Sequence, residues 1–199
     1  MNATPPIVVG ITGASGAPYA VRLLQQLTAA HRSVSLIVSK YGMRLLETES
    51  GISSIDALRL AVGKDAWDSC VTNYANDDRG AGPASGSTLT SGMIVCPCSM
   101  GTLSAIAAGS SRSLIERAAD VTLKERRKLI LVPRETPLSA IHLANMLRLT
   151  RAGAVVMPAS PGFYHRPQQI SDLVDFVVAR MLDHLEVGQT LVKRWDEQR

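Results

Sequence analysis

The sequence is poor in aromatic residues and cysteines, and it contains no long apolar run. Aromatic side chains make up 4% of its 199 residues, and no stretch approaches the roughly 20 apolar residues that a membrane-spanning helix needs. The three cysteines, Cys70, Cys96 and Cys98, are too few and too odd in number for a disulfide framework. The opening MNATPP lacks the features of a signal peptide. We therefore expect a cytoplasmic, reduced protein with no membrane partner.

Patterns typical of metal and nucleic-acid binding are also missing. The four histidines are scattered, and Cys96 and Cys98 do not supply enough closely spaced ligands for a metal ion. The formal net charge is +4, but the basic residues are dispersed apart from one cluster at 124–128, and few aromatics accompany them. We expect no metal site and no nucleic-acid partner.

Hydrophobic periodicity predicts one α/β domain with a doubly wound parallel sheet, because apolar β-branched runs alternate with segments of helical spacing. The predicted strands are 7–12, 34–38, 93–96, 129–132 and 154–157. The predicted helices are about 18–30, 41–49, 55–62, 137–152 and 171–185, with a further helix after Cys98. We expect the domain to span residues 1–185. The tail, 186–199, contains Trp195 in a polar context and is expected to contact a neighbouring subunit.

One segment, 64–90, has no clear periodicity. It is rich in Asn, Asp, Gly and Ser and includes DDRGAGPASGS. A stretch of this kind is either a functional loop or a disordered one, and its composition does not separate these alternatives.

The stretch 116–142 concentrates the chemistry that suggests a site. Arg117 and Lys124 are two helical turns apart, so they share one helix face. Arg134 and Glu135 follow a short buried strand, where ligands bind in open α/β sheets. Thr136 is the expected N-cap of the next helix, with Pro137 in its first turn. This arrangement favours a site for an anionic substrate that also needs an acid or base.

Two strand-to-helix turns suggest a nucleotide site. The first turn has glycines at 10, 13 and 16, a spacing that fits a tight turn as well as it fits phosphate binding. Ser39 ends the second strand, where NAD enzymes place an acidic residue, so Ser15 and Ser39 favour a mononucleotide phosphate or ribityl chain. Lys40 leaves NADP as an alternative. Ser99 and Thr102 lie at a later helix start, which suits an anion or polar cofactor edge.

Several other residues have simpler interpretations. We expect Cys98 to be buried rather than nucleophilic, and His142 to be a core or interface residue. Arg180 is expected to be solvated or paired with Asp183, whereas Tyr164 lies on a loop that can face a ligand.

Five segments resemble, in order and spacing, the UbiX-type flavin prenyltransferases, formerly described as phenylacrylic acid decarboxylases. They are GITGASGAPYA, CPCSMGTLSAIAAG, RAADVTLKERRKLILVPRETPLSAIHLANML, GAVVMPASPGFYHRPQ and DLVDFVVARMLD. The resemblance covers nearly the whole chain except about 52–81, and its LKERR and PRETP block is highly specific. It implies a Rossmann-like flavoprotein fold.

The resemblance also implies roles for individual residues. FMN would be bound by Gly13, Ala14, Ser15, Ser39, Ser99, Met100, Gly101, Thr102 and Arg134. Dimethylallyl phosphate would be bound, across subunits, by Ser85, Gly86, Arg117, Lys124, Tyr164 and Arg180. Glu135 matches the acid/base residue of the family. Glu49 matches a catalytic residue contributed by a neighbouring subunit, and Arg117 and Lys124 also belong to the catalytic set.

The implied reaction joins the dimethylallyl group to reduced FMN, first at N5 with loss of phosphate and then at C6, without a metal. The implied product, prenylated FMN, would serve a UbiD-type decarboxylase. The implied assembly is a homo-oligomer, a dodecamer by family resemblance.

Two alternatives remain. Flavin-dependent cysteine decarboxylases share this kind of fold, but their early-helix histidine and P-x-M-N loop do not stand out in this sequence. A non-catalytic FMN-binding assembly subunit would bind flavin without turnover.

Overall fold

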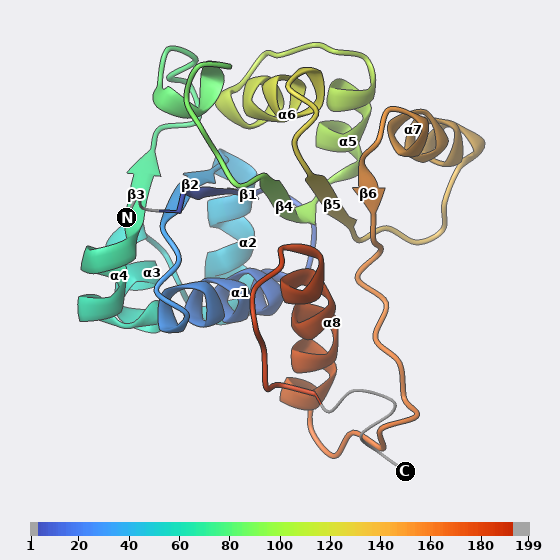
Figure 1. Cartoon of the computed structure of the whole chain (residues 1–199). Coiled ribbons are helices and arrows are strands. Elements are labelled where there is room, and N and C mark those ends of the chain that lie inside the picture. Colours follow the sequence, from blue (N-terminus) through green and yellow to red (C-terminus); the bar gives the residue numbers. More distant parts are fainter. Residues whose placement is uncertain (1–3, 193–199) are drawn as a thin grey trace.

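The central sheet contains six parallel strands in the order β3-β2-β1-β4-β5-β6 (Figure 1). The computed structural model describes residues 4–192. Its strands are β1 (Ile7–Ile11), β2 (Val34–Val38), β3 (Val71–Tyr74), β4 (Met93–Cys98), β5 (Leu129–Pro133) and β6 (Val155–Val156). The order reverses between β1 and β4, and such a switch point is where open α/β sheets bind ligands.

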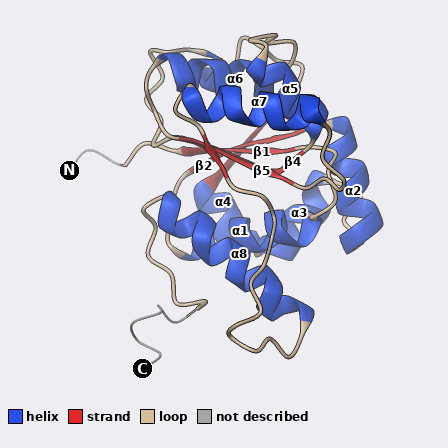
Figure 2. Ribbon diagram, turned by 90° about the vertical axis from the view of Figure 1, so that its right-hand side faces the viewer, coloured by secondary structure: helices blue, strands red, loops and turns tan. Residues whose placement is uncertain are grey.

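Helices cover both faces of the sheet (Figure 2). They are α1 (Ala17–Ala29), α2 (Lys40–Ser50), α3 (Ile55–Val62), α4 (Lys64–Cys70), α5 (Met100–Ala107), α6 (Leu114–Lys124), α7 (Ala140–Arg151) and α8 (Ile170–His184), with a 3-10 turn, η1, at Gly82–Ala84. Figure 2 shows α5, α6 and α7 on one face and α1, α3, α4 and α8 on the other. Within residues 4–192, none of these helices is long and apolar enough to cross a membrane.

Strand periodicity divides the core into two layers. Ile7, Val9 and Ile11 of β1 pack into the cluster that contains α1 and α8, whereas Val8 packs into the cluster that contains α5 and α6. Successive strand side chains point to opposite faces, so a sheet covered on both sides needs apolar residues at every position. The structure thus confirms the predicted doubly wound α/β fold.

The segment 64–90 is more ordered than either sequence interpretation allowed. It contains α4, the edge strand β3 and η1. The register of β3 against β2 pairs Val34 with Val71 and Ile37 with Tyr74. An edge strand has one unpaired side and tolerates polar residues such as Thr72 and Asn73. Its sequence therefore lacks the apolar run that reveals a central strand.

The start of α7 was predicted incorrectly. The N-cap is Ser139, whose hydroxyl accepts a hydrogen bond from the His142 amide, and not Thr136. The Ser139 amide in turn donates to His142 Nδ1. This reciprocal capping box satisfies two amide groups at the helix start, and the segment 134–138 remains an exposed loop. His142 is therefore a capping residue rather than a core residue.

The beginning of the C-terminal tail packs on its own chain. Val187 is buried in the core layer of α1 and α8, and Leu191 packs against that layer. Glu186 pairs with Lys128. Contact between the tail and a neighbouring subunit stays a prediction, and Trp195 lies outside the described residues.

Candidate functional site

The turns that follow β1, β2 and β4 converge on one pocket at the carboxyl edge of the sheet. Its lining residues are Thr12, Gly13, Ser39, Tyr41, Asn76, Ser99, Thr102, Ser113, Ile115 and Glu116. Four of the nine residues that the resemblance assigned to FMN are therefore neighbours, although they come from three separate turns. Most of the lining groups are hydroxyls, amides or backbone, which suits a polar ligand.

Helix N-termini supply much of this pocket. Ser39 caps α2, and its hydroxyl accepts a hydrogen bond from the Gly42 amide at 3.0 Å. Ser99 caps α5, accepts from the Thr102 amide at 3.2 Å and donates to Thr102 Oγ1 at 3.0 Å. Met100 and Gly101 form the first turn of α5. Unpaired amides at such termini favour phosphate and other anions.

Thr12 joins the two central turns and was not recognised from the sequence. Its hydroxyl donates to the Pro97 carbonyl at 2.9 Å and accepts from the Ser99 amide at 2.8 Å. These bonds fix the turn after β1 against the turn after β4. Thr12 is buried, with 2% of its surface exposed, and a threonine that ends an apolar strand gives no local signal of such a contact.

The glycine at position 13 is required by close packing rather than by a special backbone angle. A Cβ atom at Gly13 would lie 2.5 Å from the Tyr41 Cβ atom, and Ala14 beside it is buried. The side chain of Tyr41 is largely exposed and lines the pocket. Tyr41 and Asn76 are pocket residues that sequence reasoning missed.

Asn76 ties the segment after β3 to the start of α6. Its carbonyl accepts from the Leu114 amide at 2.7 Å, and its side-chain oxygen accepts from the Ile115 amide at 3.2 Å. The polar segment 64–90 therefore contributes to the pocket, which its composition alone did not reveal.

Glu49 lies at the glycine turn of its own chain. Its carboxylate accepts hydrogen bonds from the Gly16 and Ala17 amides, both at 2.8 Å. Burial raises the pKa of Glu49, but the hydrogen bonds from Gly16, Ser15 and Ala17, together with the charge of Arg134, outweigh it and leave the pKa below its usual value. These contacts also place Ser15 and Arg134 near the turn.

Glu49 is anchored at the glycine turn of its own chain, and its contribution to a site shared with a neighbouring subunit stays a prediction. A carboxylate is stabilised at the N-terminus of a helix by the unpaired amides and the helix dipole. Glu49, at the end of α2, is therefore held against the start of α1 in the same chain.

The pocket and the turn next to it fit a flavin mononucleotide. Hydroxyls and backbone from the turn after β1 and from the starts of α2 and α5 line the same pocket, and Arg134 adds a positive charge near the adjacent glycine turn. Gly13 leaves space where a side chain would collide. These groups can hold a phosphate and a polar ring edge without a buried unpaired charge.

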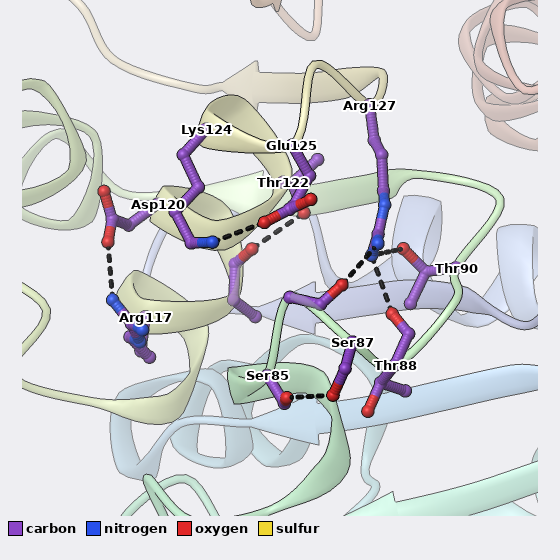
Figure 3. A network of polar contacts seen from close by, with 12 residues as sticks. Ser85, Ser87, Thr88, Thr90, Arg117, Asp120, Thr122, Lys124, Glu125 and Arg127 are labelled. Atoms are coloured by element: carbon purple, nitrogen blue, oxygen red, sulfur yellow. Dashed lines mark hydrogen bonds and ion pairs between the residues drawn. The ribbon is translucent and has the colours of Figure 1, made fainter.

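A second group of residues lies at the other end of α6 (Figure 3). Lys124 forms an ion pair with Glu125. A Cβ atom at Gly86 would lie 2.8 Å from Lys124 Nζ and would collide with Glu125 Oε1. Next to Gly86, the hydroxyls of Ser85 and Ser87 share a hydrogen bond of 2.8 Å. The structure thus brings together three of the six predicted phosphate ligands: Ser85, Gly86 and Lys124.

Arg117 lies between the two ends of α6 and is already paired. Its Nη1 atom donates to Asp120 Oδ2 at 2.8 Å, and both side chains are partly exposed. Arg117 and Lys124 lie on one helix but are each neutralised by a different carboxylate. An anion that binds both cations must replace or share these partners.

Tyr164 and Arg180 do not join that group within one chain. Tyr164 packs edge-on against Phe176 of α8, with ring centroids 5.5 Å apart. Arg180, also on α8, donates to Asp183 at 2.8 Å as expected. Helix α8 and helix α6 cover opposite faces of the sheet (Figure 2). One chain therefore does not assemble all six predicted phosphate ligands.

Glu135 is exposed at the end of β5, where its carboxylate accepts a hydrogen bond from the Thr136 amide at 3.0 Å. It is accessible to a ligand at the carboxyl edge. Arg134, the preceding residue, is also exposed.

The cysteines of β4 are buried, in agreement with the sequence interpretation. Burial raises the pKa of the Cys98 thiol to about 12, and burial together with Cys98 raises the pKa of Cys96 further. Neither thiol is ionised near neutral pH, so neither is an activated nucleophile. Among residues 4–192, no three His, Cys, Asp or Glu side chains are grouped closely enough to hold a metal ion.

Comparison with known proteins identifies the family. The Flavoprotein family model matches residues 1–182. The chain is 48% identical to the flavin prenyltransferase UbiX of Pseudomonas aeruginosa, over 100% of this chain and 97% of the relative.

Two solved structures are similar over almost their whole length. The crystal structure of AnUbiX in complex with FMN and dimethylallyl pyrophosphate has a TM-score of 0.88 and 42% identity, and the match covers 97% of this chain and 98% of that one. A dodecameric FMN-dependent UbiX-like decarboxylase from Escherichia coli O157:H7 has a TM-score of 0.88 and 43% identity, and the match covers 96% and 98%. Cysteine decarboxylases such as TvaF match at 14% identity, which shows a shared fold alone. The chain belongs to the UbiX family of flavin prenyltransferases.

Proposed function

We propose that this protein joins the dimethylallyl group of dimethylallyl phosphate to N5 and C6 of reduced FMN. The observation that carries this proposal is the position of Lys124 against the backbone of Gly86 and beside Ser85, in a chain of this family. A phosphate group is bound well by such a set: an ammonium group, exposed glycine backbone and hydroxyl groups. The related AnUbiX was crystallised with FMN and dimethylallyl pyrophosphate.

The first task of the chain is to hold the flavin. Gly13, Ala14 and Ser15 and the starts of α2 and α5 supply amides and hydroxyls, and Arg134 supplies a positive charge. When bound, reduced FMN supplies the nucleophilic N5 and C6 atoms. Glu49 keeps a negative charge beside the glycine turn at neutral pH, because its pKa is lowered.

The second task is to stabilise the departing phosphate. Arg117, Lys124 and Arg180 carry the positive charges, and each is paired with a neighbouring carboxylate in the structure. Positive groups that contact the phosphate oxygens lower the barrier to C–O cleavage, because negative charge accumulates on those oxygens. Exclusion of water by a neighbouring subunit would protect the allylic group from hydrolysis.

The third task is proton transfer. Closing a ring at C6 adds a proton to the double bond of the prenyl group and removes a proton from C6, so a group that can both donate and accept a proton is needed near it. We assign this role to Glu135, because its exposed carboxylate follows directly after Arg134 of the flavin group. Glu49 is the second carboxylate at this edge.

We propose that two copies of the chain complete the phosphate site. Arg180 is on α8 and Tyr164 packs against Phe176 of α8. Because α8 and α6 cover opposite faces of the sheet, a second copy would have to bring these residues to Lys124. The related E. coli protein is dodecameric, which supports this proposal. We also propose a dodecamer for this protein, a cytoplasmic location, and a UbiD-type decarboxylase as the recipient of the product.

The deciding experiment is an anaerobic incubation of the protein with reduced FMN and dimethylallyl phosphate, followed by mass spectrometry of the released flavin. We expect the flavin to gain the mass of one five-carbon prenyl unit. Dimethylallyl pyrophosphate in a parallel reaction identifies the preferred leaving group. An unchanged flavin mass, from protein shown to bind FMN, would contradict the proposal and favour a non-catalytic carrier.

Substitution of Glu135 tests the proton-transfer assignment. We expect Glu135→Gln to lower kcat by about a hundredfold, since a positioned base contributes on that order, while the Kd for FMN stays near the wild-type value. Full activity of the variant would show that another group removes the proton.

A further inference from the structure

We propose that Arg127 is a positioning residue that holds the loop 86–90 beside Lys124 and so shapes the phosphate site. Arg127 follows α6 by three residues and ends the LKERR segment, and the family resemblance assigns it no role in binding or catalysis. The proposal rests on the proposed phosphate site at Ser85, Gly86 and Lys124.

The end of α6 directs Arg127 toward the loop. The Arg127 amide donates to the Thr122 carbonyl at 2.9 Å, and the Arg126 amide donates to the Leu123 carbonyl at 3.0 Å. Arg126 has a left-handed backbone with a φ of 57°. These features form a Schellman motif, which ends a helix and reverses the chain direction. Arg127 therefore leaves the helix axis and reaches across to the loop.

The guanidinium of Arg127 bridges three loop residues (Figure 3). Nη2 donates to the Gly86 carbonyl at 2.7 Å, and Nη1 donates to the Thr88 carbonyl at 2.7 Å. Nη1 also lies 3.4 Å from Thr90 Oγ1. A planar guanidinium with several fixed N–H groups can hold two carbonyls at once, whereas a lysine ammonium is a single point of attachment.

The loop needs such an anchor. Leu89 in the middle of the loop is 69% exposed, and Gly86 has no side chain to restrict its backbone. Glycine loses more conformational freedom on ordering than any other residue. Because Arg127 binds the Gly86 carbonyl itself, it restrains the loop residue at which an added Cβ atom would lie 2.8 Å from Lys124 Nζ. A loop held in this way meets the phosphate without further ordering, which favours affinity.

Arg126 provides a matched control. It neighbours Arg127, carries the same charge and is exposed, and within residues 4–192 it makes no side-chain hydrogen bond or ion pair. Arg127→Gln and Arg126→Gln each remove one positive charge near Lys124, but only Arg127→Gln removes the bridge. Arg127→Lys keeps the charge and removes the two-carbonyl geometry.

The experiment measures KM and kcat for dimethylallyl phosphate, the inhibition constant of inorganic phosphate, and the Kd for FMN in all three variants. We expect Arg127→Gln and Arg127→Lys to raise KM and the inhibition constant about tenfold, which corresponds to the loss of a strong charged hydrogen bond. We expect the Kd for FMN to stay within about twofold of the wild-type value in all three variants. We also expect every constant of Arg126→Gln to stay within about twofold of the wild type.

Equal constants for Arg127→Gln and Arg126→Gln would overturn the proposal, because only charge would then matter. Wild-type constants for Arg127→Lys would overturn it for the same reason, and this variant decides the question if Arg127→Gln does not fold. The variant Lys124→Ala distinguishes a failure of the proposed phosphate site from a failure of the proposed role of Arg127. If it leaves phosphate binding unchanged, the proposed phosphate site is wrong, whereas if it alone weakens binding, only the role of Arg127 is wrong.

Discussion

At the scale of single residues, the pocket at the carboxyl edge of the sheet and the residues around Lys124 each depend on a glycine that leaves room for another side chain. Gly13 leaves room for Tyr41, and Gly86 leaves room for the charged ends of Lys124 and Glu125. The reason is space in both cases, since neither glycine has a positive φ. A glycine beside a flexible ammonium marks a place where a ligand can meet backbone and charge together.

The glycine at position 86 provides the first prediction. We expect Gly86→Ala to raise the KM for dimethylallyl phosphate about fivefold to tenfold, a cost of about 1 kcal/mol, because the new methyl group displaces Lys124 Nζ. Steady-state kinetics with reduced FMN at saturation measure this effect. Gly82→Ala is the control, because its Cβ would lie 3.8 Å from the nearest atom. A similar KM for both variants would contradict the prediction.

The second prediction concerns the pH dependence of stability. The pKa of Glu49 is lower in the folded protein than its usual value. Its contribution to the free energy of unfolding is therefore complete above the unfolded pKa and is lost as the pH falls through the folded pKa. We expect Glu49→Gln to destabilise the protein by about 0.5 kcal/mol near neutral pH, a typical value for a carboxylate at a helix N-terminus.

Urea denaturation between neutral pH and about pH 3, below the usual pKa of a glutamate, tests this prediction. The difference between the wild type and Glu49→Gln should shrink as the pH falls. A difference that does not change with pH would show that Glu49 acts through packing rather than through its charge.

At the scale of elements, the sequence predicted helices and strands correctly where the hydrophobic periodicity was strong. It failed where strand pairing or capping hydrogen bonds determine the element. All five predicted strands form, and α3 has the predicted bounds. The edge strand β3 was missed, because its pairing with β2 and not its composition makes it a strand. The beginning of α7 was misplaced because Thr136-Pro137 resembles a helix start, whereas Ser139 makes the capping bonds.

This correction provides the third prediction. We expect Ser139→Ala to lower the free energy of unfolding by about 1 kcal/mol, the usual cost of losing an N-cap. We expect Thr136→Ala to have a much smaller effect, because the hydroxyl of Thr136 does not cap α7. Denaturant midpoints of the two variants decide between them. An equal or larger loss for Thr136→Ala would restore the original interpretation.

At the scale of the whole molecule, the sheet separates residues that the proposed reaction needs together. Arg117 and Lys124 lie on α6, and Arg180 lies on α8 on the other face. No bending of one domain would unite them without disrupting the two core layers. The proposed assembly with a second copy would bring different faces of two chains together without disturbing the core of either chain.

Mixed assemblies provide the fourth prediction. We expect Lys124→Ala and Arg180→Ala each to be nearly inactive when assembled alone. Coexpressed chains should recover about a quarter of the wild-type activity, because random assembly of a shared site leaves some sites with both native residues. Turnover of purified mixed oligomers measures the recovery. No recovery would indicate that each chain supplies its whole site.

Local patterns in the sequence were sufficient for the fold class, for most elements and for the expectation of a nucleotide-binding edge at Ser39, Ser99 and Thr102. Each of these depends on a short segment, such as an apolar strand or a turn with a serine N-cap, and a strand's carboxyl end automatically lies at the same sheet edge as its parallel neighbours. The resemblance added the family, and the comparisons confirmed it.

Other features of the structure depend on contacts between segments that are distant in the sequence. The position of Glu49 at its own glycine turn, the Thr12 link between two turns and the Arg127 bridge to the loop 86–90 join residues far apart in the sequence. A hydrogen bond of this kind leaves no periodic signal, because it depends on how whole elements pack. The separation of α6 from α8 by the sheet is likewise a property of the packed layers. It is why one chain brings four of the nine predicted FMN residues into one pocket but keeps Arg180 away from Lys124.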